Sequence, residues 1–382
     1  MPDLQFFAIR KQYLLIFGAF MLSLNSCHIG RYFIYNFANI TDYKKFQERT
    51  ISTDPENVYN FSRDIDARMM VNPYTANRYK NVEELESYLE DSKSVALLVI
   101  HNDTIKYEWY ANKWSNDELV TSFSMSKSVI SAMIGVALDE GHIKSLDDPI
   151  TDYIKTFKHE GFDEITIQHL LDMRTGIDYN ESYYNPFGNV AIGYYGRNLD
   201  RHISNLKIKG PPGEEFEYIS IATQLLGNII EEATGQTVST YMQEKIWSKI
   251  GTEFDASWSM DRKKGREKSF CCINAHAEDF AKFARLYLNM GNWEGEQIIP
   301  EDWVKQSIQI HKDTEDNFYQ NQWWLFGPSD PTQPELVTYA AQGHLGQVMA
   351  IDPTKNLIII RFGKQWGKTN WLGYFKSLAK SF

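Results

Sequence analysis

The stretch that decides the fold is Ser122-Phe123-Ser124-Met125-Ser126-Lys127, which continues without a break into an apolar run ending at Leu138. Ser124 lies three residues before Lys127, and positions three apart share one face of a helix. The hydroxyl and the amine can therefore come within hydrogen-bonding distance. A serine hydroxyl is a poor nucleophile until a base takes its proton, and a lysine can be that base when burial lowers its pKa. The apolar residues that follow Lys127 predict such burial.

The Ser-x-x-Lys pattern alone is also compatible with a polar helix start that carries an ordinary surface lysine. The same pattern recurs at Ser204–Lys207 and at Ser377–Lys380, so at least two of the three copies arise by chance. The second copy runs into a Gly-Pro-Pro sequence at 210–212, and the third lies among the last residues. Only the copy at Ser124 opens a long apolar helix, which favours it as the functional one.

Length and composition indicate a folded protein and exclude some classes of function. With 382 residues, of which 43% are hydrophobic, the chain can bury a large core in one composite domain or two closely packed ones. A net charge of −11 argues against a nucleic-acid partner. No His or Cys spacing resembles a zinc site, so we expect neither a metal nor a cofactor. The expected partner is a small-molecule or peptide substrate, and the oligomeric state is left open.

The first 27 residues have the pattern of an export signal. Arg10 and Lys11 precede an apolar run at 14–24, and Asn25-Ser26-Cys27 follows it. This pattern resembles a bacterial lipoprotein signal, in which the cysteine is lipidated and becomes the first mature residue. The alternative is an uncleaved anchor, because apolar residues resume at 32–35. Both interpretations predict an exported bacterial protein, either periplasmic or held at the membrane through its N-terminus alone.

The other two cysteines, Cys271 and Cys272, are adjacent. Neighbouring cysteines reach the Cα separation and torsion of a disulfide only with strain. We therefore expect no disulfide framework.

The order of patterns along the chain predicts an α+β fold. Residues 28–84 are polar and loop-like, and we interpret them as a tether that leads into a single domain at 85–382. Runs at 95–100 and 104–110 have the pattern of a β-hairpin, and further strand patterns lie between 322 and 362. Helical patterns dominate the middle of the chain. We therefore expect an antiparallel sheet built from both ends of the domain, flanked by helices, with a mainly helical insertion.

A tyrosine-rich segment, Asp178–Pro186, has neither helical nor strand periodicity. A long loop inside a compact domain is often functional, as a wall or lid of a cleft. Tyr179 is our candidate substrate contact there. A solvated surface loop is an equally good interpretation.

Two further stretches have residue types suited to a catalytic site. Tyr218 stands just before a predicted helix, with Ser220 two residues later, and a phenol at a helix entrance can relay protons. Gly343 and Gly346 flank His344 at the start of a predicted strand, where glycines permit close backbone approach to a ligand. The alternatives are a core tyrosine and a tight turn that carries an ordinary histidine.

In this order, the three motifs resemble those of the serine β-lactamase and penicillin-binding-protein superfamily, on its class C-like branch. Ser124–Lys127 matches Ser-x-x-Lys, Tyr218–Ser220 matches Tyr-x-Asn/Ser, and His344–Gly346 matches Lys/His-x-Gly. The resemblance covers residues 85 to 382 and includes three connecting blocks, at 146–149, 169–176 and 213–227.

The resemblance implies a β-lactamase/transpeptidase-like fold and acyl transfer without a cofactor. Ser124 would be the nucleophile, with Lys127 and Tyr218 as the proton-transfer pair, and which of the two is the general base stays open. Backbone amides of Ser124 and Gln347 would hold the oxyanion. Three further residues are expected to contact the substrate: Ser220, His344 and Gly346.

Two departures from the family pattern move the expected substrate away from β-lactam antibiotics. Antibiotic-degrading class C enzymes usually have Asn at the position of Ser220 and Lys at the position of His344. The variant found here looks more like that of esterases, D-amino-peptidases and 6-aminohexanoate-dimer hydrolases. We therefore expect a serine hydrolase that cleaves an amide or ester through an acyl-enzyme. The alternatives are a D,D-peptidase or penicillin-binding protein, and a non-catalytic lipoprotein that binds cell-wall peptides.

Overall fold

The computed structural model describes residues 28–35, 37–65, 82–157, 161–310, 318–328, 332–333 and 336–382. The predicted export signal at 1–27 lies outside these ranges. Among the described residues, no helix is both long and apolar enough to cross a membrane.

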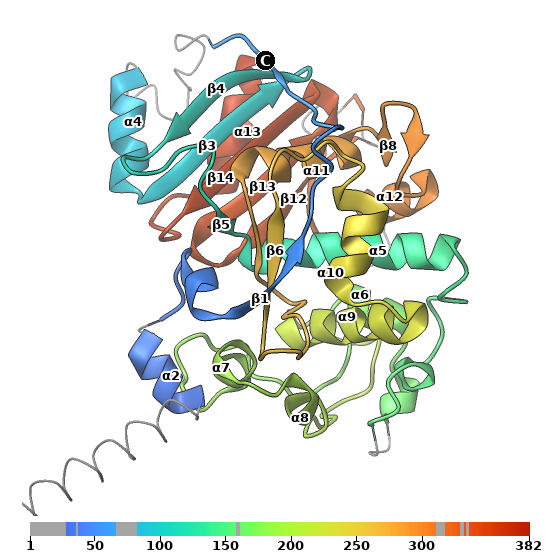
Figure 1. Ribbon diagram of the computed structural model, residues 1–382. Coiled ribbons are helices and arrows are strands. Elements are labelled where there is room, and N and C mark those ends of the chain that lie inside the picture. Colours follow the sequence, from blue (N-terminus) through green and yellow to red (C-terminus); the bar gives the residue numbers. More distant parts are fainter. Residues whose placement is uncertain are drawn as a thin grey trace, which may run out of the picture.

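The larger sheet has eight strands and joins the two ends of the domain (Figure 1). Strand β14 pairs with β3 in antiparallel register, with Ile360 opposite Leu98. All neighbouring pairs are antiparallel except β2 and β4. The predicted sheet is therefore confirmed. Its strands in spatial order are β10 (Tyr319–Gln320), β11 (Trp323–Pro328), β12 (Val337–Gly343), β13 (Gln347–Asp352), β14 (Leu357–Gly363), β3 (Ser94–His101), β4 (Thr104–Tyr110) and β2 (Ser62–Arg63).

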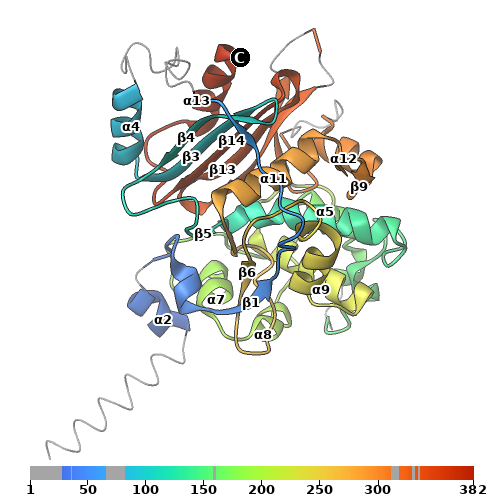
Figure 2. The same ribbon diagram turned by 45° about the horizontal axis from the view of Figure 1, so that its top comes forward.

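Helices cover both faces of this sheet, as the continuous apolar runs of β3 and β14 require. On one face, α4 (Val82–Asp91) and α13 (Trp371–Leu378) pack on apolar side chains of β3, β4, β13 and β14. On the other face lies α11 (Ala277–Leu288), which contacts β13 and β14 (Figure 2). The β3–β4 turn is formed by Asn102 and Asp103, both with left-handed backbone (φ 50° and 55°), as a two-residue hairpin requires.

The helical part forms the other half of the molecule, below the sheet in Figure 1. Its central helix is α5 (Ser126–Asp139), which packs against α9 and is buried at every position from Ser126 to Ala137. Gly141 has φ 74° just after the helix, a left-handed conformation that ends it. The other helices are α6 (Ile167–Leu171), α7 (Asn189–Tyr195), α8 (Leu199–Ile203), α9 (Ser220–Thr234), α10 (Val238–Met242), a π-helical turn (Gln243–Trp247) and α12 (Glu301–Ile308).

The segment expected to be loop-like contains regular structure. Helix α2 (His28–Tyr35) contacts α7, and β1 (Gln47–Ile51) pairs with β6. Most side chains of β1 are exposed, and the strand is held by its backbone pairing together with an ion pair from Arg49 to the buried Glu267, neither of which composition reveals. A second sheet results, with the order β1, β6 (Ala256–Met260), β7 (Ile273–Ala275) and β5 (Val120–Thr121). A small ribbon is formed by β8 (Asn292–Trp293) and β9 (Glu296–Gln297).

The expectation that Cys271 and Cys272 remain unbridged is wrong, because the structure joins them in a disulfide. Cys272 has left-handed backbone (φ 76°). That conformation is uncommon for a residue with a side chain, and adjacency in the sequence does not reveal it.

Candidate active site

Ser124 and Lys127 meet where the second sheet leads into α5. Ser124 lies in a short 3₁₀ turn (Phe123–Met125), and Lys127 lies in the first turn of α5. Lys127 Nζ is 3.3 Å from Ser124 Oγ. The turn is held from outside, because the amide of Ser122 donates to the carbonyl of Ile273 in β7 (2.8 Å). The predicted pairing of hydroxyl and amine is present.

Lys127 is surrounded by neutral partners. Its side chain is buried, and Nζ donates to the carbonyl of Phe270 (2.6 Å) and the hydroxyl of Ser220 (3.4 Å). The aromatic rings of Tyr218 and Phe270 lie 5.4 and 5.8 Å from Nζ. Burial lowers the pKa of Lys127 to about 8, although the charge of Glu181 acts in the opposite direction. The amine is therefore neutral in a substantial fraction of molecules near pH 8 and can accept a proton from Ser124.

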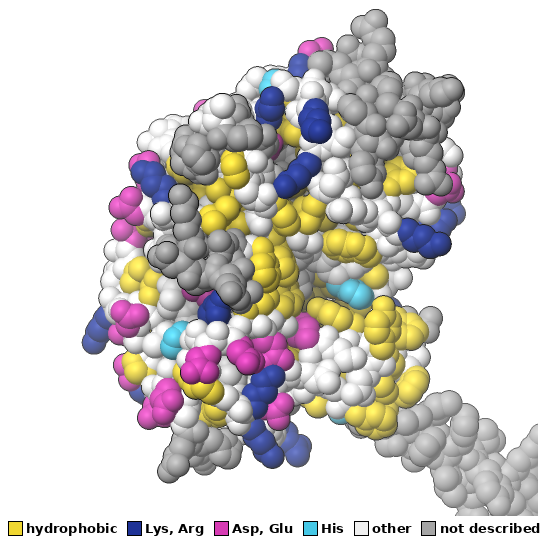
Figure 3. Space-filling model, turned by 180° about the vertical axis from the view of Figure 1, so that it is seen from behind, with side chains coloured by type: hydrophobic (Ala, Val, Ile, Leu, Met, Phe, Trp, Pro, Cys, Tyr) yellow, Lys and Arg dark blue, Asp and Glu magenta, His cyan; other side chains and the backbone are white. Residues whose placement is uncertain are grey.

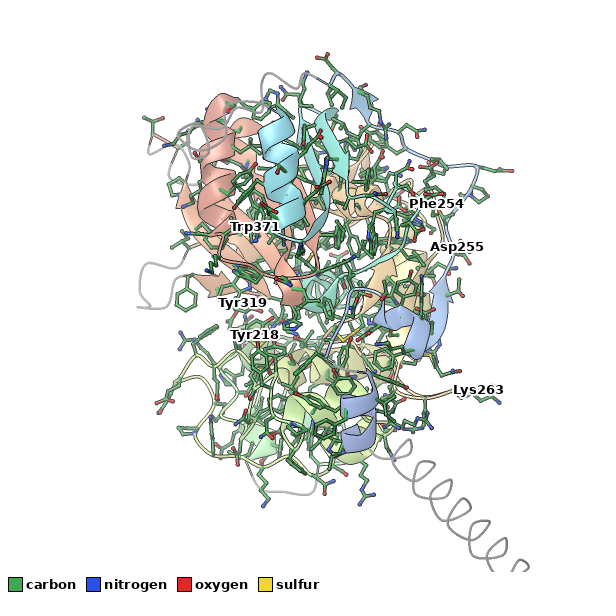
Figure 4. The ribbon with its side chains drawn as sticks, turned by 90° about the vertical axis from the view of Figure 1, so that its left-hand side faces the viewer. Tyr218, Phe254, Asp255, Lys263, Tyr319 and Trp371 are labelled. Carbon is green, nitrogen blue, oxygen red and sulfur yellow. A yellow bond between two sulfur atoms is a disulfide. The ribbon has the colours of Figure 1, made fainter. Side chains whose placement is uncertain are left out.

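Tyr218 precedes α9 and is fixed by aromatic contacts. Its ring stacks on Trp324 (5.5 Å between centroids) and meets Tyr319 edge-on (5.9 Å), and Figure 4 shows Tyr218 and Tyr319 close together between the sheet and the helical part. Burial raises the pKa of Tyr218 well above its ordinary value, although its hydrogen bond with Ser124 acts in the opposite direction. The phenol is therefore neutral, which suits a proton relay better than a resident base.

The tyrosine-rich loop contributes Glu181, a residue that the sequence analysis missed. Its carboxylate accepts hydrogen bonds from the amide of Ser220 (2.8 Å), the hydroxyl of Ser220 (2.5 Å) and the phenol of Tyr183 (2.9 Å). The hydroxyl of Ser220 thus stands between this carboxylate and Lys127. The one signal in the sequence is the position of an acidic residue inside a loop already suspected of forming a wall.

Strand β12 approaches the nucleophile through Gly343. A Cβ atom on this residue would lie 2.3 Å from the carbonyl oxygen of Ser122, so the approach requires glycine. Gln347 opens β13 opposite Gly343, and its buried side chain pairs with the backbone of Gly363 (2.7 and 2.8 Å). Gly346, with φ 82°, supplies the turn between the two strands. This geometry brings the start of β13 to the side of Ser124, as an oxyanion-binding amide requires.

His344 forms part of the wall of a cavity of about 170 Å³ that also contains Ser124 and Ser220. Its ring stacks on Tyr183 with centroids 4.8 Å apart and planes nearly parallel. Burial lowers the pKa of His344, so this wall is aromatic and uncharged at neutral pH. Figure 3 shows a hollow at the centre of one face of the molecule, bordered by hydrophobic side chains and a histidine.

Tyr179 is not in this cavity, so its assignment as a substrate contact is corrected. It belongs to the hydrophobic core, with 4% of its surface exposed, and its ring packs 6.0 Å from His202. The backbone of Ile177 pairs with Ile208, which fixes the start of the loop and directs Tyr179 inward. Tyr183 and Tyr184, further along the loop, line the cavity instead.

No group of three or more His, Cys, Asp or Glu residues in the described part of the chain could hold a metal ion. The groups that the site offers for chemistry are a hydroxyl, an amine that is partly neutral near pH 8, a phenol, a carboxylate and backbone amides.

Comparison with known proteins decides the family. The model of the Beta-lactamase family matches residues 82–370. The chain belongs to the beta-lactamase family. Over 299 residues it is 26% identical to the 6-aminohexanoate-dimer hydrolase of Paenarthrobacter ureafaciens, covering 73% of this chain and 74% of that protein. It is also 26% identical to Esterase EstB of Burkholderia gladioli over 149 residues, covering 35% of this chain and 37% of the esterase.

Solved structures share the fold. A putative 6-aminohexanoate-dimer hydrolase from Bacillus anthracis has a TM-score of 0.74 at 23% identity, covering 89% of this chain and 92% of that one. A penicillin-binding protein from Bacillus halodurans has a TM-score of 0.60 at 19% identity, covering 78% and 98%. The β-lactamase/transpeptidase-like fold is confirmed, and this member of the beta-lactamase family is a serine hydrolase.

Proposed function

We propose that this member of the beta-lactamase family hydrolyses a small amide or ester through an acyl-enzyme on Ser124. The observation that carries the proposal is the buried amine of Lys127, whose pKa burial lowers to about 8, at 3.3 Å from Ser124 Oγ. A neutral amine at this distance can take the hydroxyl proton as the oxygen attacks.

We assign each step of the proposed reaction to a group of the site. Ser124 Oγ attacks the carbonyl carbon while Lys127 accepts its proton, and the backbone amides of Ser124 and Gln347 bind the oxyanion. Lys127, with Tyr218 as a relay, returns the proton to the leaving amine or alcohol. Water then attacks the acyl-enzyme by the same route, releasing the acid and restoring Ser124.

The substrate class is inferred from the wall of the cavity. His344 and Ser220 occupy positions where antibiotic-degrading relatives carry lysine and asparagine, and His344 is uncharged beside Tyr183. The position of the relatives' lysine therefore carries no cation that could pair with a β-lactam carboxylate. We propose uncharged acyl groups, as in small esters and linear amides, and export of the enzyme by its N-terminal signal.

The test uses Ser124→Ala and a matched control, Ser377→Ala, which alters the look-alike tetrad at the end of α13. We expect Ser124→Ala to abolish both hydrolysis of a chromogenic ester and labelling by a fluorophosphonate, in which Ser124 Oγ bonds to phosphorus and fluoride leaves. Ser377→Ala should retain both. Full labelling of Ser124→Ala would exclude Ser124 as the nucleophile.

A substrate panel separates this proposal from its alternatives. We expect turnover of small esters or linear amides, with little hydrolysis of nitrocefin. Release of D-Ala from D-Ala-D-Ala peptides together with stable acylation by penicillin would instead identify a D,D-peptidase. Binding of cell-wall peptides without covalent labelling would identify a non-catalytic binder.

A further inference from the structure

Large hydrophobic side chains are exposed mainly in one place. Of the eight that are exposed in the described part of the chain, five lie on or beside α2 and the tyrosine-rich loop. We call these five the apolar rim: Phe33 (66% exposed), Ile34 (51%), Phe37 (50%), Tyr184 (77%) and Phe187 (70%). Soluble proteins rarely gather exposed aromatic side chains in this way unless the patch binds something.

Contacts link α2 and Phe37 to the tyrosine-rich loop, and the apolar rim reaches the active site. The rings of Phe37 and Tyr184 lie 6.4 Å apart, and the imidazole of His28 hydrogen-bonds to the backbone of Pro186, next to Phe187. Phe37 and Tyr184 also line the cavity that contains Ser124. Whatever covers the rim therefore also lies at the mouth of the active site.

A basic hollow of about 650 Å³ adjoins the rim under α2. It is lined by Arg31, Arg197, Arg201 and Lys207, with Asp178 as its acidic member. In the described part of the chain, no ion pair engages Arg197, Arg201 or Lys207. The protein as a whole is acidic, with a net charge of −11, so this concentration of positive charge is local. Basic side chains beside exposed aromatic ones are typical of a surface that binds anionic lipid.

The position of α2 in the chain indicates the partner. The described part of the helix starts at His28, the residue after Cys27, where the sequence predicts a lipid or an anchor. Phe33 follows His28 by five residues, which corresponds to roughly 7.5 Å along the helix. A membrane attachment at or before Cys27 therefore holds the apolar rim within reach of the lipid headgroups. A second copy of this chain fits less well, because a two-fold contact would bring two basic hollows together.

We propose that the apolar rim and the basic hollow bind the surface of an anionic lipid bilayer, so that the mouth of the active site faces the membrane. The aromatic side chains enter the interface between headgroups and acyl chains, while Arg201 and Lys207 contact phosphate. Substrates then enter from the membrane surface. This last consequence rests on the proposed hydrolase function, whereas the docking itself does not.

The test is hydroxyl-radical footprinting of the full chain in vesicles, with the oxidation of each side chain measured by mass spectrometry. In vesicles that contain phosphatidylglycerol, we expect slower oxidation of Phe33 and Phe187. Ile65, which follows the edge strand β2 of the large sheet, should be oxidised at an unchanged rate. One basic residue near an anionic surface contributes about a fivefold preference for the bound state. The double variant Arg201→Gln/Lys207→Gln should therefore lower the ratio of docked to undocked protein by roughly 30-fold. The oxidation of Phe33 and Phe187 should then return to its rate without phosphatidylglycerol.

The chain offers a matched pair of controls, since Ile34 and Ile65 are both 51% exposed. Ile34→Ser should weaken protection of Phe187, and Ile65→Ser should leave it unchanged. Equal oxidation with and without phosphatidylglycerol would overturn the proposal. Protection that disappears when the vesicles are diluted to one protein each would overturn it in favour of a second copy. Hydrolysis of a soluble ester by the same variants reports on Ser124 separately, so a failure of docking and a failure of the proposed function are distinguishable.

Discussion

Removing the charge of Glu181 should shift the pH dependence of activity toward lower pH. In the native enzyme, Lys127 must be neutral to accept the proton of Ser124, so kcat/KM should rise with pH through about 8. The Glu181 carboxylate is bound to the hydroxyl of Ser220, which in turn binds Lys127, so the two charges lie roughly 6 Å apart. At an effective dielectric constant of about 20, this attraction amounts to ~2.8 kcal/mol, or about two pH units.

We therefore expect the ascending limb of the profile to move from about pH 8 in the native enzyme to about pH 6 in Glu181→Gln. The glutamine amide can face the hydroxyls of Ser220 and Tyr183, which rotate to accept, so the local packing survives. The plateau rate should fall, because a weaker base drives proton transfer less strongly. The assay is kcat/KM for a neutral chromogenic ester from pH 5 to 10, with the exposed Glu56→Gln as the control. A limb that stays near pH 8 in an active Glu181→Gln enzyme would refute the assignment of Lys127 as the base tuned by Glu181.

Two further substitutions test the site from other directions. Lys127→Met should abolish activity but raise the free energy of unfolding at pH 7 by up to ~3 kcal/mol, because burial of the amine lowers its pKa from 10.5 to about 8. The difference in unfolding free energy between the native protein and Lys127→Met should shrink as the pH rises from about 8 to 10.5, because in this range Lys127 is deprotonated in the folded state but still protonated in the unfolded state. Urea unfolding at several pH values measures this difference. A difference that does not change with pH would contradict the shifted pKa. Gly343→Ala places a methyl group 2.3 Å from the carbonyl of Ser122 and should lower kcat by about 10²-fold, whereas Gly210→Ala, with nothing within 4 Å, should keep the native kcat. Equal kcat in the two glycine variants would show that β12 need not approach the nucleophile so closely.

The parts of the fold that were predicted correctly are those in which local pattern and tertiary role coincide. The β3–β4 hairpin lies where its two strand patterns meet, with its turn at Asn102 and Asp103, and α5 ends one residue after the apolar run that closes at Leu138. The apolar run after Lys127 predicted a buried helix, and burial is what lowers the pKa of this lysine. A single sequence pattern thus predicted both an element and the electrostatic property of its first turn.

The features that were missed depend on contacts between distant segments. Strand β1 has mostly exposed side chains and is defined by its backbone partner β6, which lies more than 200 residues later. Glu181 lies in a loop without periodicity, and its role follows from a contact with Ser220, 39 residues away. Tyr179 and Tyr183 are equivalent in the sequence, but the pairing of Ile177 with Ile208 directs the first into the core. Composition does not distinguish such residues, because neither periodicity nor residue type encodes which distant group they meet.

The distance between Glu181 and Lys127 provides an explanation for the serine at position 220. A carboxylate in direct contact with the amine would hold the ammonium form and raise its pKa, and the lysine would then be a poor base near neutral pH. With no carboxylate nearby, burial would lower the pKa further and leave the amine a weaker proton acceptor. The hydroxyl of Ser220 separates the two groups while donating to Glu181 and accepting from Lys127. The pKa of about 8 for Lys127 is therefore a balance between burial, which lowers it, and the Glu181 carboxylate, which raises it. Ser220 sets the distance between the carboxylate and the amine.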